Sequence, residues 1–433
     1  MLAQLTTTAL HRRGLHYAWV VAGVTFLALL TTSAALGLPG VMLQPLRREF
    51  GWTTEQLSSV FAVRFALFGL LGPFAALFIA RFGLRRIMVV AASLIAVAMA
   101  LATGVTQLWQ LFVLWGLVLG CGTGLTALVL GAMVASRWFS HHRGLVVGLF
   151  AASTATGQLL FLPLAAWLIQ HHGWRFAVLP VVAACVGVGL LATLFMRDHP
   201  QDLGLRAYGE PADAPSVAPP APVPLRFWGP LSVLAEVARQ RIFWVLAGSF
   251  FICGLSTNGL VQTHFISLCS DHGLGPVPAA SVLAMMGAFD LVGTTLSGWL
   301  SDRWDNRKLL CWYYALRGLS LIWLPFSTFT LYGLSLFAMF YGLDWIATVP
   351  PTVRLAGQAY GRERAGLVFG WVFAAHQLGA AVAAWGAGLT RTLLLTYDPA
   401  LFAAGAACLG AAALVMSIRR PGAGAAVPVR APA

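Results

Sequence analysis

The chain has 433 residues, of which 59% are hydrophobic and 9% charged, with a formal net charge of +13. Soluble globular proteins are about 45–50% apolar and about 25% charged, so the composition excludes an ordinary soluble domain. The apolar residues form long runs separated by short polar breaks, which indicates a helical protein that crosses a membrane many times. The first run, from about Tyr17, is too long for a signal peptide and lacks a clear cleavage site.

Twelve apolar runs of about 20 residues are long enough to cross a bilayer as helices. The predicted spans are 17–41, 56–80, 87–104, 108–135, 144–169, 176–196, 242–267, 279–301, 309–327, 330–351, 365–389 and 399–418. The expected fold is therefore all-α and membrane-embedded.

The longest break between spans divides six from six. It includes a stretch, 211–224, that is too rich in proline for a helix and too polar to insert into a membrane. A surface helix is expected over 230–244. The predicted organisation is an N-terminal half over 1–196, a central loop over 197–241, a C-terminal half over 242–420 and a disordered tail over 421–433.

Basic residues gather on one side of the predicted membrane. With the N-terminus in the cytoplasm, 21 of the 27 basic residues are cytoplasmic, two lie within spans, and four are external, namely Arg47, Arg48, Arg175 and Arg391. This positive-inside bias accounts for the net charge without nucleic acid and places both termini in the cytoplasm. Lys308 is the only lysine, and abundant Arg, Ala, Gly and Pro are typical of a high-GC bacterial genome, so a bacterial inner membrane is the predicted location.

Cofactor and metal chemistry have no clear signal in the sequence. The six cysteines are scattered, mostly in apolar runs, and none forms a C-x-x-C pair. We interpret them as small buried hydrophobic residues. No nucleophile and base, and no set of metal ligands, occur at a useful spacing, so neither an enzyme nor a cofactor or metal site is expected.

A charged loop occurs twice, six helices apart, which indicates an internal repeat. The second copy, GWLSDRWDNRK over 298–308, has Asp302 and Arg303 followed by Arg307 and Lys308. The first copy, ALFIARFGLRR over 76–86, keeps basic residues but has Ala80 where the second has an aspartate. With its twelve spans, the doubled loop resembles the major facilitator superfamily, whose signature here is G-x-L-x-D-R-x-G-R-[KR].

The resemblance implies two pseudo-symmetric six-helix halves with a substrate site between them at the midplane. It also implies a conformational latch in these loops, for which the candidates are Asp302, Arg303, Arg307, Arg81, Arg85 and Arg143. Asp302 would face the start of the fifth span near Arg143, across the two halves, in one state only. The alternative is that these charges only set topology.

Three segments are similar to the monocarboxylate and oxalate/formate branches of that family, namely 46–61, 136–149 and 171–177. Thr53 and Gln56, in the first of them, predict a capping box at the start of the second span. The chain departs from those branches where Thr294 stands one turn after Asp290 in place of a substrate-binding arginine. It also has no lysine in the eleventh span.

Four ionisable residues lie deep within spans, namely Arg64, Asp290, Arg317 and Asp344. Each costs roughly 2.5–3.5 kcal/mol at a helix centre, so each needs a partner, water or a function. We predict that Arg64 binds an anion, because a guanidinium grips a carboxylate with two hydrogen bonds. Asp290 and Asp344 are the predicted proton carriers, and structural pairing of either with Arg317 is the alternative.

Neutral polar residues in the seventh and eleventh spans complete the predicted substrate site. Asn258 and Gln262 lie one turn apart, and His376 and Gln377 occupy the eleventh span. His376 could equally be a packing residue, and His264 is expected at the outer membrane interface. Pro350 and Pro351 are expected to end or bend the tenth span.

These features predict a monomeric secondary transporter that takes up a small organic anion, such as a monocarboxylate, together with protons. The alternative is a proton-antiport exporter of amphipathic compounds, whose cavity would be more apolar and would tolerate the loss of Arg64. A non-transporting sensor would need an extra soluble domain, for which the sequence has no candidate.

Overall fold

The computed structural model describes residues 15–126, 128–211 and 228–418, together with 4, 6–8 and 12 near the N-terminus. The described residues contain helices and one isolated bridge, between Phe139 and Tyr208, but no strand. Twelve of their helical segments are long and apolar enough to cross a membrane. The all-helical prediction is confirmed, whereas the predicted disordered tail and most of the proline-rich stretch lie outside the described residues.

The first six spans are formed from nine helical elements. They are α2 (Ala18–Phe50), α3 (Thr54–Phe82), α4 (Leu84–Ala102), α5 (Leu108–Leu111), η1 (Phe112–Val118), α6 (Leu119–Leu125), α7 (Leu128–Trp138), α8 (Arg143–His172) and α9 (Trp174–Phe195). The short helices α5 to α7 and η1 together form the fourth span.

The central segment and the second six spans follow. They comprise η2 (Pro200–Leu203), α10 (Trp228–Val237), α11 (Arg241–Gly254), η3 (Leu255–Gln262), α12 (Thr263–Asp271), α13 (Pro276–Ser301), α14 (Asn306–Trp323), η4 (Leu324–Phe326), α15 (Leu331–Asp344), α16 (Val349–Tyr360), α17 (Arg362–Leu394) and α18 (Asp398–Met416). The predicted surface helix exists as α10, but it ends at Val237, before the seventh span begins at Arg241.

Local backbone signals explain several of these ends. At the start of α3, Gln56 N donates to Thr53 Oγ1 over 3.1 Å and Thr53 N donates to Gln56 Oε1 over 2.9 Å, as the predicted capping box requires. The tenth span breaks over 345–348, directly before Pro350 and Pro351 in the first turn of α16. Proline is favoured at that position because it has no N–H to leave unpaired.

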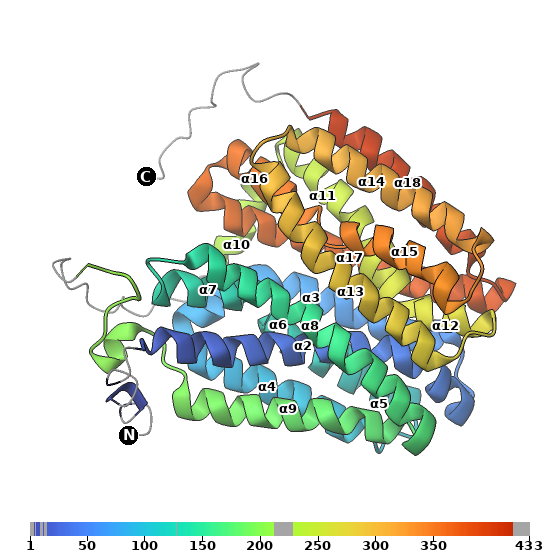
Figure 1. The fold of residues 1–433 in the computed structure, drawn as a ribbon, viewed down its shortest axis with the longest axis horizontal. Coiled ribbons are helices and arrows are strands. Elements are labelled where there is room, and N and C mark those ends of the chain that lie inside the picture. The colour runs from blue at the N-terminus through green and yellow to red at the C-terminus, as the bar shows by residue number, and fades with distance from the viewer. Residues whose placement is uncertain are drawn as a thin grey trace.

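The bundle has two ends with different loops. We call one end the Arg-rich face; it contains Gly83 and the loops over 140–142 and 302–305. The Arg-poor face, at the other end, contains Gly51, Gly173 and the loops over 272–275 and 395–397. In Figure 1 the first half (blue to green) lies below the second half (yellow to red).

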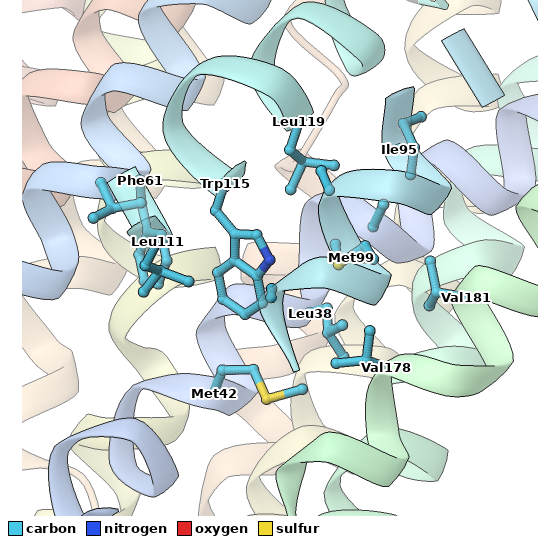
Figure 2. Close-up of a cluster of buried hydrophobic side chains, with 14 of the residues drawn as sticks. Leu38, Met42, Phe61, Ile95, Met99, Leu111, Trp115, Leu119, Val178 and Val181 are labelled. Atoms are coloured by element: carbon cyan, nitrogen blue, oxygen red, sulfur yellow. The ribbon is translucent and has the colours of Figure 1, made fainter. Parts of the chain in front are cut away.

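The apolar core shows where the two halves meet. One buried cluster combines N-terminal residues around Trp115 with Ala380 and Ala384 of α17, and a second combines Leu162 and Ala166 of α8 with residues of the C-terminal half. Figure 2 shows the Trp115 ring between Phe61, Met42 and Met99. Both clusters lie toward the Arg-poor face.

Two further clusters lie toward the Arg-rich face, and each belongs almost entirely to one half. The third is built only from residues between Tyr17 and Tyr208. The fourth is built from residues after 230, with the partly buried Phe74 as its contribution from the other half. The halves are therefore packed together at the Arg-poor face and largely separate at the Arg-rich face.

Glycines allow the two halves to approach closely along α3 and α17. A Cβ atom added at Gly69 would lie 2.5 Å from Gln377 Cβ, and one added at Gly388 would lie 2.5 Å from Ser58 Oγ. At the same end, Glu55 N donates to Thr392 Oγ1 over 3.1 Å. These contacts show that α3 and α17 run antiparallel. Arg64 lies at a depth between the Gly69 contact and the Gly388 contact.

Candidate functional site

Arg64 is buried in α3, with 1% of its surface exposed. Its Nη1 donates weakly to the Ala35 carbonyl of α2 over 3.5 Å, and its Nε has no hydrogen-bond partner among the described residues. The guanidinium carbon lies 4.7 Å from the Phe65 ring centroid and 5.7 Å from that of Phe61. The described part of the chain offers it no ion pair, so its charge is compensated only by aromatic faces and one carbonyl.

The neutral candidates lie on η3 and α17, at a depth similar to that of Arg64. A Cβ at Gly259 would approach the backbone of Ala380, which lies on α17 between the Gly69–Gln377 and Ser58–Gly388 contacts. Asn258, next to Gly259, is half-buried, whereas Gln262 is buried. The fold thus brings Asn258 to the level of Arg64 on the opposite half.

The eleventh-span candidates have unsatisfied polar atoms. Gln377 Oε1 and His376 Nδ1 are buried and have no hydrogen-bond partner among the described residues. The His376 ring also packs against Phe250 and Phe373, with ring centroids 4.9 and 5.7 Å apart. Packing alone does not satisfy a buried polar atom, so both side chains keep a group that could bind a ligand.

His264 lies near the Arg-poor face, beside the loop over 395–397, but it is buried there and not exposed to an interface. Only 1% of its surface is exposed, and Nε2 donates to the Ala384 carbonyl over 2.8 Å, while Nδ1 lies 3.3 Å from Tyr397 Oη. Its partners are on α17 and in the loop before α18, so the ring ties neighbouring helices of one half together. It is therefore a packing residue.

Arg317 and Asp344 form a buried ion pair, the alternative that the sequence left open. Arg317 Nε donates to Asp344 Oδ2 over 2.7 Å. The same guanidinium donates to the Asp344 carbonyl over 2.5 Å and lies 2.9 Å from Cys253 Sγ. Cys253 was not among the predicted site residues, because a lone cysteine in an apolar span has no distinguishing signal.

Among the described residues, the hydrogen-bond donors of Asp290 are neutral. Its Oδ1 accepts from Thr294 Oγ1 and from Ile346 N, both over 2.9 Å, and the side chain is buried. Ile346 lies in the break of the tenth span, where backbone groups lose their helical partners. Asp290 and Arg317 therefore satisfy backbone groups released on the two sides of this break.

The candidate latch residues do not meet across the halves in this conformation. Asp302 pairs with Arg354 of α16, within its own half, and Arg143 Nε donates to the Phe139 carbonyl over 2.5 Å. Arg307 pairs with Asp305 and donates to the Ile418 carbonyl, while Arg303 lies over the Trp299 ring. The latch remains a prediction for a state closed at the Arg-rich face.

In the first half, the charged loop over 76–86 has Ala80 where the second copy has an aspartate, and Asp198 supplies a carboxylate there from outside the loop. Asp198, three residues after α9 ends at Phe195, accepts a hydrogen bond from Arg85 N over 2.9 Å. It therefore caps the start of α4 beside Gly83, where a carboxylate is favoured by the helix dipole. Sequence reasoning missed Asp198 because it lies outside the repeated motif.

Comparisons with known proteins agree with the fold. The family model described as Major Facilitator Superfamily matches residues 24–384. An uncharacterized MFS-type transporter, YcxA of Bacillus subtilis, is 26% identical over a region that covers 74% of this chain and 75% of YcxA. Monocarboxylate transporter 13 of Bos taurus is 27% identical over 78% of this chain and 74% of its own.

The region aligned with monocarboxylate transporter 13 of Rattus norvegicus is longer: the two chains are 25% identical over 93% of this chain and 89% of the relative. Among solved structures, a D-xylose-proton symporter superposes with a TM-score of 0.72 at 16% identity, over 95% of this chain and 100% of that one. At that identity the structural likeness establishes the fold. The family match, the twelve spans and the repeated loop together show that the chain belongs to the Major Facilitator Superfamily.

Proposed function

We propose that this transporter takes up a small organic anion, such as a monocarboxylate, together with protons, by alternating access. The observation that carries the proposal is the buried guanidinium of Arg64, which has no carboxylate partner among the described residues. A buried charge without a partner is costly, so a bound carboxylate would supply the negative charge that the Arg64 guanidinium lacks. The similarity to monocarboxylate transporters supports this class of substrate.

The polar groups at the depth of Arg64 suit a small anion with a second polar group. The Arg64 guanidinium would take the carboxylate, and the amides of Asn258 and Gln262 would approach from the other half. Gln377 and His376 would supply further hydrogen bonds from α17. A ligand held by both halves can favour one conformation over another, which alternating access requires.

Asp290 is the proposed proton carrier. Both hydrogen bonds that it accepts from the described residues go to Oδ1, so Oδ2 can carry a proton without breaking either of them. Desolvation favours the neutral carboxyl. Asp344 is the weaker candidate, because Arg317 already holds its Oδ2.

The Arg-rich face is the proposed cytoplasmic side, from the positive-inside rule. The conformation, packed at the Arg-poor face, would then be closed to the outside. A substrate released from it would enter the cytoplasm, as uptake requires.

The proposal is tested by thermal unfolding of the purified protein with small monocarboxylates and with amphipathic cations, at acidic and alkaline pH. A ligand that binds the folded state raises the unfolding temperature by mass action. We expect one carboxylate family to stabilise the wild type, more strongly at acidic pH, and Arg64→Gln to lose this additional stabilisation at acidic pH while remaining folded. Arg241→Gln, which removes an exposed arginine far from the site, is the matched control.

Two results would overturn the proposal. An unchanged carboxylate response in Arg64→Gln would return this arginine to a structural role. Stabilisation by amphipathic cations alone would favour the proton-antiport exporter. For the coupling ion, proteoliposomes containing a pH-sensitive dye should report proton entry with substrate in the wild type and not in Asp290→Asn.

A further inference from the structure

A cationic hollow lies at the Arg-poor face, away from Arg64. Its volume is about 300 Å³, and residues of both halves line it. The N-terminal half contributes the end of α2 and the start of α3, including Arg47, Arg48 and Thr53, and the C-terminal half contributes Arg391 and Thr392 from α17.

Two of the three arginines that line this hollow have no ion-pair partner among the described residues. Glu49, next to Arg48, accepts from Arg175 over 2.6 Å and from Trp174 Nε1 over 2.6 Å, outside the hollow. Among the described residues, neither Arg47 nor Arg48 forms an ion pair. They lie at the C-terminal end of α2, which accounts for two cations there but not for their position around a hollow.

Arg391 completes the cationic rim from the other half. Its Nε and Nη2 donate to the two oxygens of Asp271 over 2.7 and 2.9 Å, so its orientation is fixed. The Thr53 hydroxyl accepts from Gln56 N and keeps its own hydrogen to donate. The rim therefore presents guanidinium and hydroxyl donors to the same space.

The hollow is complete only while the Arg-poor face is closed. Its two sides are joined by the hydrogen bond from Glu55 N to Thr392 Oγ1, which connects α3 to α17. Separation of the halves at this face would move Arg391 and Thr392 away from Arg47 and Arg48. A ligand that contacts both sides would favour the closed state.

We propose that this hollow is a second anion site, which binds a small oxyanion from the side of the Arg-poor face and holds that face closed. Arg47 and Arg48 grip the anion, and the Thr53 hydroxyl donates to it. The choice of a carboxylate as the natural anion rests on the proposed function, whereas the presence of an oxyanion site rests on the hollow itself.

The test is thermal unfolding of the purified full chain during titration with acetate or sulfate, with chloride used to hold the ionic strength constant. We compare the wild type with three variants: Arg47→Gln/Arg48→Gln, Arg64→Gln, and Arg239→Gln/Arg241→Gln. The last removes two exposed arginines from the opposite end and controls for the change in net charge. The proposal expects a saturable stabilisation that persists in Arg64→Gln and in Arg239→Gln/Arg241→Gln and whose apparent Kd rises at least tenfold in Arg47→Gln/Arg48→Gln.

The variants separate this site from the central one. Retention of the response in Arg64→Gln, with loss in Arg47→Gln/Arg48→Gln, supports the second site whether or not the central site binds a carboxylate. A response to acetate but not to sulfate would show that the site is selective for carboxylates. Equal responses would show that it binds oxyanions in general. Loss of the whole response in Arg64→Gln, no response in the wild type, or an unchanged Kd in Arg47→Gln/Arg48→Gln would each overturn the proposal.

Discussion

Two buried arginines of this transporter differ in how their charges are compensated. Arg317 has a carboxylate, two carbonyls and a thiol within hydrogen-bond distance, whereas Arg64 has one carbonyl at 3.5 Å and two aromatic rings. The sequence identified both residues as costly, since hydropathy shows where a charge enters a span. It could not show which one is paired, because the partners of Arg317 lie on other spans, up to 64 residues away.

The ion pair of Arg317 leads to a stability prediction. Removal of one partner from a buried pair leaves the other charge without compensation, which typically costs about 3–5 kcal/mol. We expect both Arg317→Ala and Asp344→Ala to lower the unfolding temperature strongly, and the double variant to lose less than their sum. Chemical unfolding in detergent, analysed as a double-mutant cycle, measures the coupling between the two residues. Additive losses would show that the ion pair does not stabilise the fold.

The tenth span shows how buried polar residues support an irregular helix. Between α15 and α16 the backbone leaves the helical path over 345–348, and in a membrane such a break needs internal hydrogen-bond partners. Asp290 accepts from Ile346 N, and Arg317 donates to the carbonyls of Asp344 and Trp345. The deep charges of the C-terminal half are therefore located around one break.

The break leads to a prediction that separates the hydrogen bonds that the Asp290 side chain accepts from the charge that it can carry. An asparagine can still accept from Ile346 N and Thr294 Oγ1, so Asp290→Asn should unfold within about 1 kcal/mol of the wild type. Asp290→Ala leaves the partly buried Ile346 N–H without its acceptor and should cost about 1–3 kcal/mol more. Thermal unfolding of the two variants side by side gives the comparison. Equal stability of both variants would mean that the hydrogen bond to Ile346 does not maintain the break.

At the level of elements, local signals were predictable and long-range ones were not. Thr53 and Gln56 predicted the start of α3, because a capping box depends on residues three apart. Pro350 and Pro351 predicted an interruption in the tenth span, and the structure places it just before them. Asp198 as the cap of α4 could not be found this way, since it reaches Arg85 from 113 residues away.

For the whole molecule, hydropathy and the repeated loop predicted the fold, because span length is set by the bilayer. They could not indicate which conformation the two halves adopt. That depends on contacts between helices distant in sequence, such as those of α3 with α17 at Gly69 and Gly388. It also explains why Asp302 is found with Arg354 and away from Arg143: the halves are separate at the Arg-rich face.

The contact at Gly388 predicts a shift between conformations. A methyl group there would lie 2.5 Å from Ser58 Oγ and 3.1 Å from the Thr54 carbonyl, both on the other half. Overpacking of this kind costs about 1–3 kcal/mol. The cost falls only on the state closed at the Arg-poor face, so Gly388→Ala should move the equilibrium toward the state open there. Gly386→Ala is the matched control, because it adds the same methyl group to α17 where no other atom lies within 4 Å.

Spin-label distances across each face measure this shift, after the six native cysteines have been replaced. Labels at the exposed positions Thr106 and Tyr332 report on the Arg-poor face, and labels at Ser140 and Trp304 report on the Arg-rich face. In Gly388→Ala we expect longer distances for the first pair and shorter ones for the second, because the two faces open alternately. Gly386→Ala should match the wild type at both. Wild-type distances in Gly388→Ala would show that some contact other than α3 with α17 holds the Arg-poor face closed.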